Sequence, residues 1–308
     1  MNAISLRPSK KVYLLIHVVL GRSAPPNAKR IGALCTCLAG QVLGVMLIGQ
    51  SWCFGQESFS AVSPPRPWIL GHATPFSQAI FTDRPTFSVG PGTIAKGHIQ
   101  IETGYTFSFE DAHPDVRTHT FPETLLRIGL VEKAEFRVEW PNLTYIDTGR
   151  NVDGFRDLGL GFKVQVFQQQ GFRPRLSVAG RFSIPTGDEA FSSDQLDPEL
   201  RTILTYALDE RVELFGNVNI AGPSSRGTRF VQVSSSLGLS AILWDHLSGF
   251  IEYFGFYPRD VASGSAHFLQ TGLIYGLTYN LQIDARIGGG LTHGSDDLLT
   301  GAGISWRF

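Results

Sequence analysis

Acidic and basic side chains recur at every second position in several stretches of the chain. Glu135, Arg137 and Glu139 are the clearest case, because this spacing puts both signs of charge on one face of an extended strand. Such a face could form matched ion pairs that hold an interior together, or charged rings that select a small polar or aromatic solute. Both interpretations stay open. The charged candidates for an inward face are Glu102, Glu123, Arg127, Glu135, Arg137, Glu139, Arg181, Glu199, Arg201, Glu213, Asp284 and Arg286, with Lys163 and Arg307 in the same pattern.

The stretches that carry these charges alternate apolar and polar residues with period two. In the first of them, Ile99 and Ile101 alternate with Gln100 and Glu102. Twelve such runs follow residue 97, and most have the length that lets a tilted strand cross a bilayer. They span about 98–109, 118–129, 133–141, 155–167, 172–184, 198–208, 211–221, 229–243, 247–257, 267–277, 280–289 and 298–308.

The last run ends the chain on aromatic residues. Ile304, Trp306 and Phe308 share one face, and Ser305 and Arg307 share the other. Aromatic rings at the end of a strand suit a membrane interface better than open water. We therefore predict that Trp306 and Phe308 form an assembly signal, read by the barrel assembly machinery of an outer membrane.

The connections between the runs alternate in length. Long connections are expected at 110–117, 142–154, 185–197, 222–228, 258–266 and 290–297, and short ones at 130–132, 168–171, 209–210, 244–246 and 278–279. Bacterial outer-membrane barrels alternate long outer loops with short periplasmic turns in this way. The sequence predicts an all-β fold, a transmembrane antiparallel up-and-down β-barrel of about 12 strands over residues 97–308. A soluble β-sandwich is the alternative, but it gives no reason for this alternation.

Charge and cysteine content restrict the partners. Residues 1–55 contain six basic residues and no acid, so the rest of the chain has 20 basic and 27 acidic residues. This net negative charge argues against nucleic acid as a partner. The predicted barrel implies outer-membrane lipid as a partner. All three cysteines, Cys35, Cys37 and Cys53, lie in the same first segment. Cysteine chemistry is therefore excluded from residues 56–308.

The first 96 residues divide into two parts. Residues 1–55 are predicted to be an N-terminal extension and signal peptide, with a basic start, an apolar run and a small-residue end; an uncleaved anchor is the alternative. Residues 56–96 are rich in proline and are predicted to be a periplasmic linker or a partial plug of the barrel. We interpret Phe81 to Phe87, followed by Pro91 and Gly92, as a turn-rich approach to the first strand.

Three segments resemble a known bacterial family: Thr82-Asp-Arg-Pro85, Gly97 to Phe107, and Phe121 to Leu130. The chain is similar there to the outer-membrane proteins assigned to transport in the phenol meta-cleavage pathway, and the similarity extends over about Phe81 to Phe308. That family supplies no catalytic residues to transfer. The resemblance implies an outer-membrane barrel with a transport-like role.

We therefore expect a passive or weakly selective outer-membrane channel for small solutes, with aromatic or hydrophobic ones among the candidates. One alternative is a structural barrel that conducts nothing. Another is an outer-membrane lipid hydrolase, for which His267 near Ser265, His246, and His293 near Ser295 are available without a recognisable catalytic motif. No enzyme activity, cofactor or metal is assigned, and the pair Asp296-Asp297 is interpreted as solubilising.

Overall fold

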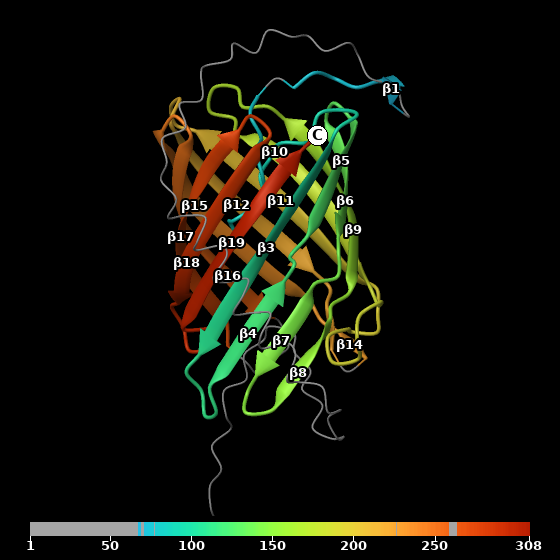
Figure 1. Ribbon diagram of the computed structural model, residues 1–308, viewed down its shortest axis with the longest axis vertical. Helices are drawn as coiled ribbons and strands as arrows, with labels where there is room; N and C mark the ends of the chain where they lie inside the picture. Colours follow the sequence, from blue (N-terminus) through green and yellow to red (C-terminus); the bar gives the residue numbers. More distant parts are fainter. Residues whose placement is uncertain (1–66, 69–70, 77, 226, 259–263) are drawn as a thin grey trace, which may run out of the picture. The chain divides into compact units, whose positions relative to one another are not determined.

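The computed structural model describes residues 67–68, 71–76, 78–225, 227–258 and 264–308. The predicted signal peptide and the three cysteines lie outside the described residues. The main body is an antiparallel β-barrel of twelve strands, which confirms the predicted fold (Figure 1). No helix among the described residues is long and apolar enough to span a membrane.

The twelve barrel strands follow one another in chain order, and three of them are interrupted and carry two labels. They are β3 (Ile99–Glu110), β4 (Val116–Phe121) with β5 (Leu125–Val131), β6 (Ala134–Glu139) with β7 (Leu143–Asp147), β8 (Asn151–Phe155) with β9 (Leu158–Phe167), β10 (Arg175–Ile184), β11 (Asp197–Ala207), β12 (Val212–Ala221), β15 (Gln232–Trp244), β16 (Leu247–Pro258), β17 (Ala266–Thr278), β18 (Leu281–Gly290) and β19 (Leu298–Arg307). Two small hairpins lie outside this sheet, β1 (Pro67–Trp68) with β2 (Gly71–His72) and β13 (Ser224–Ser225) with β14 (Thr228–Arg229).

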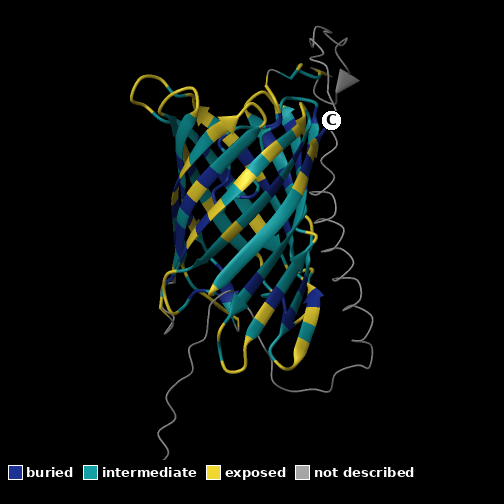
Figure 2. Ribbon diagram, turned by 60° about the vertical axis from the view of Figure 1, so that its left-hand side comes forward, coloured by how far each residue is buried: buried dark blue, intermediate teal, exposed yellow. Residues whose placement is uncertain are grey.

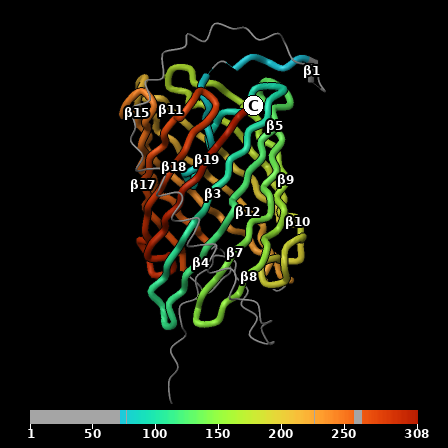
Figure 3. The backbone as a smooth tube through the Cα atoms, viewed as in Figure 1, coloured from blue at the N-terminus to red at the C-terminus, as the bar shows by residue number. Residues whose placement is uncertain are grey.

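Each barrel strand pairs with its neighbours in the sequence, and the backbone trace winds once around the barrel (Figure 3). The sheet closes where β19 pairs antiparallel with β3, for example Ile304 facing Thr103. Closure pairs every barrel strand on both sides except β8, which pairs with β7 alone among the described residues. A closed ladder is the condition for crossing a bilayer with strands. We call the end with the longer connections the loop end and the end with the short connections the turn end.

Burial alternates along the strands, as period two requires (Figure 2). The outward positions are apolar and exposed, such as Leu237, Ile251 and Leu273. The inward positions are polar and buried, and Lys163 and Glu252 are fully buried. An apolar outer surface around a polar interior is the arrangement of a membrane barrel.

Three adjacent barrel strands are interrupted at the same level, where our sequence prediction was wrong. The runs 118–129, 133–141 and 155–167 are not simple strands, and most of the predicted loop 142–154 belongs to the hairpin of β7 and β8. We call the interruptions at 122–124, 140–142 and 156–157 the seam. Proline causes two of them, because Pro122 and Pro141 have no N–H to donate to a ladder.

The seam also shifts the inward face by one residue in each strand. In the strand formed by β4 and β5, Thr118 and Arg127 are both buried inside, although one position is even and the other odd. The same change of parity separates Arg137 from Thr144 in the next strand. One added residue per strand has this effect, because side chains alternate strictly between the two faces of a strand.

Residues 78–97, which we call the inner segment, run inside the barrel from the turn end and return to β3. Near the start of the segment, the N–H of Ile80 donates to the carbonyl of Tyr279, 2.8 Å away. It ends where the N–H of Gly97 donates to the carbonyl of Gly129, 2.9 Å away. Between these points Val89 and Ile94 are buried against the barrel interior.

Candidate functional site: the lumen and its inner segment

Residues 82–87, which we call the tip of the inner segment, are bound to the barrel wall through Asp83. Its carboxylate lies 2.6 Å from the guanidinium of Arg137, 3.5 Å from that of Arg127 and 3.4 Å from the ammonium of Lys163. Burial alone would raise the pKa of Asp83, but these three cations outweigh it and hold the pKa well below its usual range. Asp83 is therefore an ionised carboxylate inside the lumen at neutral pH.

Two glutamates complete this buried cluster. Glu135 accepts two hydrogen bonds from Arg127, at 2.9 and 3.0 Å, and a third from Arg137 at 2.8 Å. Glu102 accepts from Arg127 at 2.8 Å. Side chains of Arg127, Glu102, Glu135 and Lys163 have 0% exposure, so each charge depends on its partners rather than on water.

The same glutamates hold the backbone of the inner segment. Glu102 accepts the N–H groups of Asp83 and Arg84 at 2.9 and 3.2 Å, and Glu135 accepts the N–H of Ile94 at 2.8 Å. These are charge-assisted hydrogen bonds, which are stronger than bonds between neutral groups. The charged wall thus replaces the backbone pairing that a segment inside a barrel lacks.

The opposite wall holds the segment through Glu252 on β16. Its two oxygens accept the N–H of Phe87 and the N–H and hydroxyl of Ser88, at 2.8, 2.8 and 2.6 Å. Gln270 donates to the same carboxylate at 2.6 Å. The lumen therefore binds the segment from opposite sides. Backbone carbonyl groups of the inner segment accept further hydrogen bonds from the side chains of Arg127, Lys163, Ser177, Arg286 and Arg307.

Arg84 extends from the tip toward the closing strands. Its guanidinium lies 3.1 Å from Glu123 and 3.4 Å from Asp284. Two glycines make room for it, because a Cβ atom at Gly104 or Gly303 would overlap the guanidinium group. The barrel wall is therefore shaped to receive this side chain.

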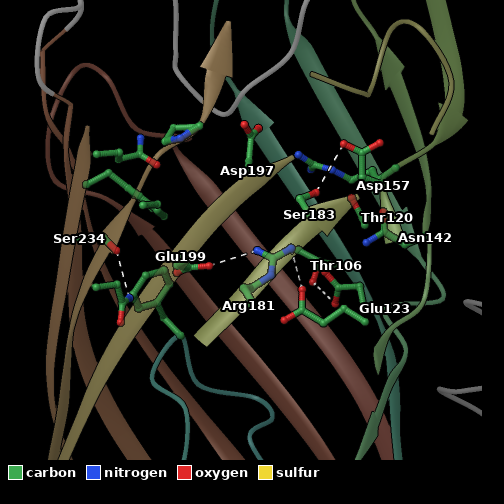
Figure 4. A pocket seen from close by; sticks show the side chains of 18 of the residues that line it. Thr106, Thr120, Glu123, Asn142, Asp157, Arg181, Ser183, Asp197, Glu199 and Ser234 are labelled. Atoms are coloured by element: carbon green, nitrogen blue, oxygen red, sulfur yellow. Dashed lines mark hydrogen bonds and ion pairs between the residues drawn. The ribbon is translucent and has the colours of Figure 1, made fainter. Parts of the chain in front are cut away.

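A second charge cluster forms its ion pairs without a residue of the inner segment. Arg181 lies 2.9 Å from Glu139 and 3.1 Å from Glu199, and Arg201 lies 2.9 Å from Glu199. Figure 4 shows Arg181 directed toward Glu199. These side chains are between 14% and 33% exposed, so they face a water-accessible space.

That space is a cavity of about 640 Å³ in the loop-end half of the barrel. One part of its lining is charged and includes Glu139, Arg156, Arg181, Glu199 and Arg201. Another part is apolar and contains Phe87, Phe254, Phe256, Phe268 and Leu299. The cavity therefore offers both an ionic and an apolar surface to a solute, at a volume typical of small-molecule sites.

The apolar part is an ordered stack of rings. Phe254 stacks on Phe87 with ring centroids 4.6 Å apart and on Phe268 with centroids 4.8 Å apart. Phe87 belongs to the inner segment, and the other two belong to β16 and β17. The tip of the segment thus contributes to the cavity as well as to the charge cluster.

The structure brings most of the predicted charges together in these clusters. Glu102, Arg127, Glu135 and Arg137 form the first, Glu139, Arg181, Glu199 and Arg201 form the second, and Glu123 and Asp284 bind Arg84. Arg286 donates to Pro85 and to Thr106, at 2.9 and 2.8 Å. Glu213 lies apart, near the turn end of β12, where it faces Ser240 in the ladder. Selection of a solute by these charges stays a prediction.

Sequence reasoning missed the partners of the predicted charges. Asp83 and Arg84 lie in the stretch that we interpret from the sequence as a turn-rich approach, although two charged residues beside a proline can indicate an ordered contact. The period-two pattern could have placed Glu252 on the inward face, because Glu252 alternates with the outward residues Ile251 and Tyr253 in β16.

The residues of the predicted assembly signal lie on the outer surface. Trp306 is 56% exposed and Phe308 is 44% exposed, and their ring centroids are 5.2 Å apart. The backbone of Phe308 also exchanges two hydrogen bonds of 2.9 Å with Ile99. Recognition by an assembly machinery stays a prediction.

The residues considered for a hydrolase do not form a catalytic pair. The hydroxyl of Ser295 donates to the backbone carbonyl of His267, and the His267 ring instead lies 2.6 Å from the hydroxyl of Tyr253. No cluster of three metal-ligating side chains occurs among the described residues. In the acidic pair, Asp297 accepts the N–H of Asp111. The pKa of Asp296 is raised, because the side chain is partly buried and lies near the negative charge of Asp297.

One solved structure agrees with this architecture. The outer-membrane channel COG4313 from Pseudomonas putida F1 matches with 14% identity and a TM-score of 0.57, over 73% of this chain and 100% of the channel. The NanC porin matches with 9% identity and a TM-score of 0.48, over 68% of this chain and 100% of the porin. A search of curated proteins found no match.

A family model matches residues 82–308, from the tip of the inner segment to the last residue. Its description is "Putative MetA-pathway of phenol degradation". The match covers more than half of the sequence, and the chain belongs to this family.

Proposed function

We propose that this protein is a passive channel of the bacterial outer membrane that admits small solutes and is narrowed by its own inner segment. The closed barrel with an apolar outer surface and a polar lumen supports a membrane-spanning role. The family match and the likeness to an outer-membrane channel support the same conclusion. The proposal assigns no chemical reaction to the barrel.

The observation that carries the proposal is the division of the lumen. The loop-end half contains a cavity of about 640 Å³, whereas the inner segment lies across the turn-end half and is bonded to opposite walls. A twelve-strand barrel is wider than barrels that side chains alone can fill. The segment therefore decides what passes toward the turn end.

The test is ion conductance of the purified protein in planar bilayers, with and without the inner segment. We expect small single-channel currents for the whole protein and clearly larger currents when residues 78–95 are replaced by a short glycine-serine linker. Migration that changes on heating will show that the variant still folds as a barrel. Absence of current from both proteins would refute a channel.

A second candidate is a barrel that stays closed until its inner segment is displaced. The buried ion pairs of Asp83 favour it, because breaking them without replacement is costly. Current from the deletion variant, together with none from the whole protein, would support this candidate.

A further inference from the structure

The cavity narrows abruptly at its floor, which is the side that faces the turn end and is marked by Arg181 in Figure 4. Glu139, Arg181 and Arg201 line both the cavity and a second void of about 10 Å³, and Val89 and Ala179 line the void alone. A void must measure about 10–15 Å³ to hold one water molecule. The open space therefore narrows from about 640 Å³ to room for a single water molecule.

An apolar contact between the inner segment and the barrel wall borders this void. Val89 of the inner segment packs with Ala179 of β10 and Ile203 of β11, and their exposed fractions are 5%, 7% and 0%. We call these three residues the apolar seal. Their side chains offer water no hydrogen bond, and small apolar spaces inside proteins stay dry. The seal is therefore a dry contact at the floor of a wet cavity.

Polar residues lie on both sides of the seal. The inward residues next to it on β10 and β11 are Arg181 and Arg201 toward the loop end and Ser177 and Thr205 toward the turn end. A solute that moves along this wall finds hydrogen-bonding groups before and after the seal but not within it. Crossing is most costly for an ion, because a charge without water or a partner costs far more free energy than a neutral polar group does.

The inner segment is bonded to the wall on both sides of Val89. The ammonium group of Lys163 donates to the carbonyl of Gly90 at 3.0 Å, and the hydroxyl of Ser177 donates to the carbonyl of Pro91 at 2.5 Å. Before Val89, the hydroxyl of Ser88 lies 2.6 Å from that of Ser236. These polar contacts hold Val89 against the wall.

We propose that the apolar seal of Val89, Ala179 and Ile203 is the ion barrier of this channel. Ions reach the seal from the cavity and cross it only when water wets the contact, whereas small uncharged solutes cross at a lower cost. The seal thus separates charged from uncharged solutes without a charge of its own. The inference rests on the proposed function, because solutes must first enter the cavity, and it adds the place and the physical cause of the barrier.

The first test adds one hydroxyl to the seal from the barrel side. Ala179→Ser changes no hydrogen bond or ion pair of the inner segment, and serine leaves slightly less space than alanine. We expect the single-channel current in planar bilayers to increase roughly fivefold, which is the effect of about one added hydrogen bond on the barrier. A purely steric constriction predicts the opposite sign, so an unchanged or lower current would overturn the inference.

The second test separates polarity from size at Val89. Threonine has nearly the shape of valine, whereas alanine removes volume without adding a polar atom. We expect Val89→Thr to increase the current more than Val89→Ala does, because only threonine offers water a hydrogen bond within the seal. A larger increase with alanine would assign the barrier to size and overturn the inference.

An uncharged solute distinguishes a wetted seal from a loosened inner segment. Swelling of proteoliposomes in glycerol should change less than about twofold in Ala179→Ser and Val89→Thr, because glycerol loses less than an ion does in a dry contact. Asp83→Asn, which breaks an ion pair of the inner segment, should increase both current and swelling. A parallel increase of current and swelling in the seal variants would show that the segment had moved, and would overturn the inference.

The matched control adds a hydroxyl outside the seal. Ala207 occupies an inward position of β11 near the turn end, where it faces Glu213 in the ladder, and Ala207→Ser should leave the current unchanged. Equal increases in Ala207→Ser and Ala179→Ser would overturn the inference. Migration that changes on heating shows that each variant is a folded barrel.

The variant without residues 78–95 distinguishes failure of the seal from failure of the channel. Current from that variant, with none gained by the seal variants, would refute the seal and leave the channel intact. Absence of current from the whole protein, the seal variants and the variant without the segment would refute the channel as well.

Discussion

The carboxylate of Asp83 lies 2.6 Å from the guanidinium of Arg137, in an ion pair that joins the tip of the inner segment to the barrel wall. Asp83 also approaches Arg127 and Lys163. Asp83, Glu102 and Glu135 together therefore offset the charges of three buried cations. The segment and the wall therefore share one charge balance. Removing a charge from either side should change how firmly the segment is held.

The first prediction is that Asp83→Asn loosens the inner segment. The substitution leaves part of the charge of Arg137 and Lys163 unbalanced in a buried site, and such losses typically cost about 3–5 kcal/mol. We expect larger single-channel currents and faster proteolysis within residues 78–95. Asp209→Asn, at an exposed turn, is the control, and equal currents from both variants would contradict this role of Asp83.

The second prediction concerns pH. The folded-state pKa of Asp83 is lowered, so its ionised form stabilises the bound segment above the ordinary value of 3.8. This stabilisation is lost as the pH falls below that value toward the folded pKa. Conductance should stay constant from neutral pH to about pH 4 and increase only in stronger acid. The acid-dependent step should be absent in Asp83→Asn; its persistence there would assign the step to another group.

The double variant Arg127→Gln/Arg137→Gln is the third prediction. Both arginines bind Asp83 and Glu135, so their loss leaves buried carboxylates without partners. We expect a shift of ion selectivity toward cations, a lower thermal stability and a more open lumen. Reversal potentials in a salt gradient measure the selectivity. Arg211→Gln, at an exposed turn, should keep the wild-type potential; an unchanged potential in the double variant would exclude these charges from the conduction path.

The sequence was sufficient for the barrel but not for its contents. Period two placed Glu102, Arg127 and Glu135 on the inner face, because side-chain direction in a strand depends only on local alternation. The partner Asp83 lies in a proline-rich segment without periodicity, and its contact with Lys163 joins residues 80 positions apart. Nothing local specifies such a pairing.

The seam was missed for a different reason. A single inserted residue reverses every later side chain, so the alternation on each side of Pro122 and Pro141 looked regular on its own. Proline inside a predicted strand was the available signal, because it cannot donate to a central ladder. Arg156 had no such signal, since its place in the cavity depends on where three strands are interrupted together.

A fourth prediction addresses assembly. Phe308→Ala keeps the backbone bonds to Ile99 but removes the terminal ring, so it separates recognition of the ring from barrel closure. We expect accumulation and degradation in the periplasm instead of heat-modifiable protein in the outer membrane. Phe172→Ala, which removes a ring that is 97% exposed at a turn, should assemble normally. Normal insertion of the Phe308 variant would refute the assembly signal.

The last prediction displaces the inner segment without changing any charge. A Cβ atom at Gly129 would overlap the backbone carbonyl groups of Ile94 and Ala95, where the segment returns to β3. Gly129→Ala should therefore push this end of the segment away from β5, at a cost of about 1–3 kcal/mol, and increase the conductance. Gly180→Ala is the matched control, because a Cβ atom there meets nothing within 4 Å. If the two alanine variants conduct equally while both migrate as folded barrels, contact between the segment and Gly129 does not limit the current, and the constriction must lie nearer to Asp83.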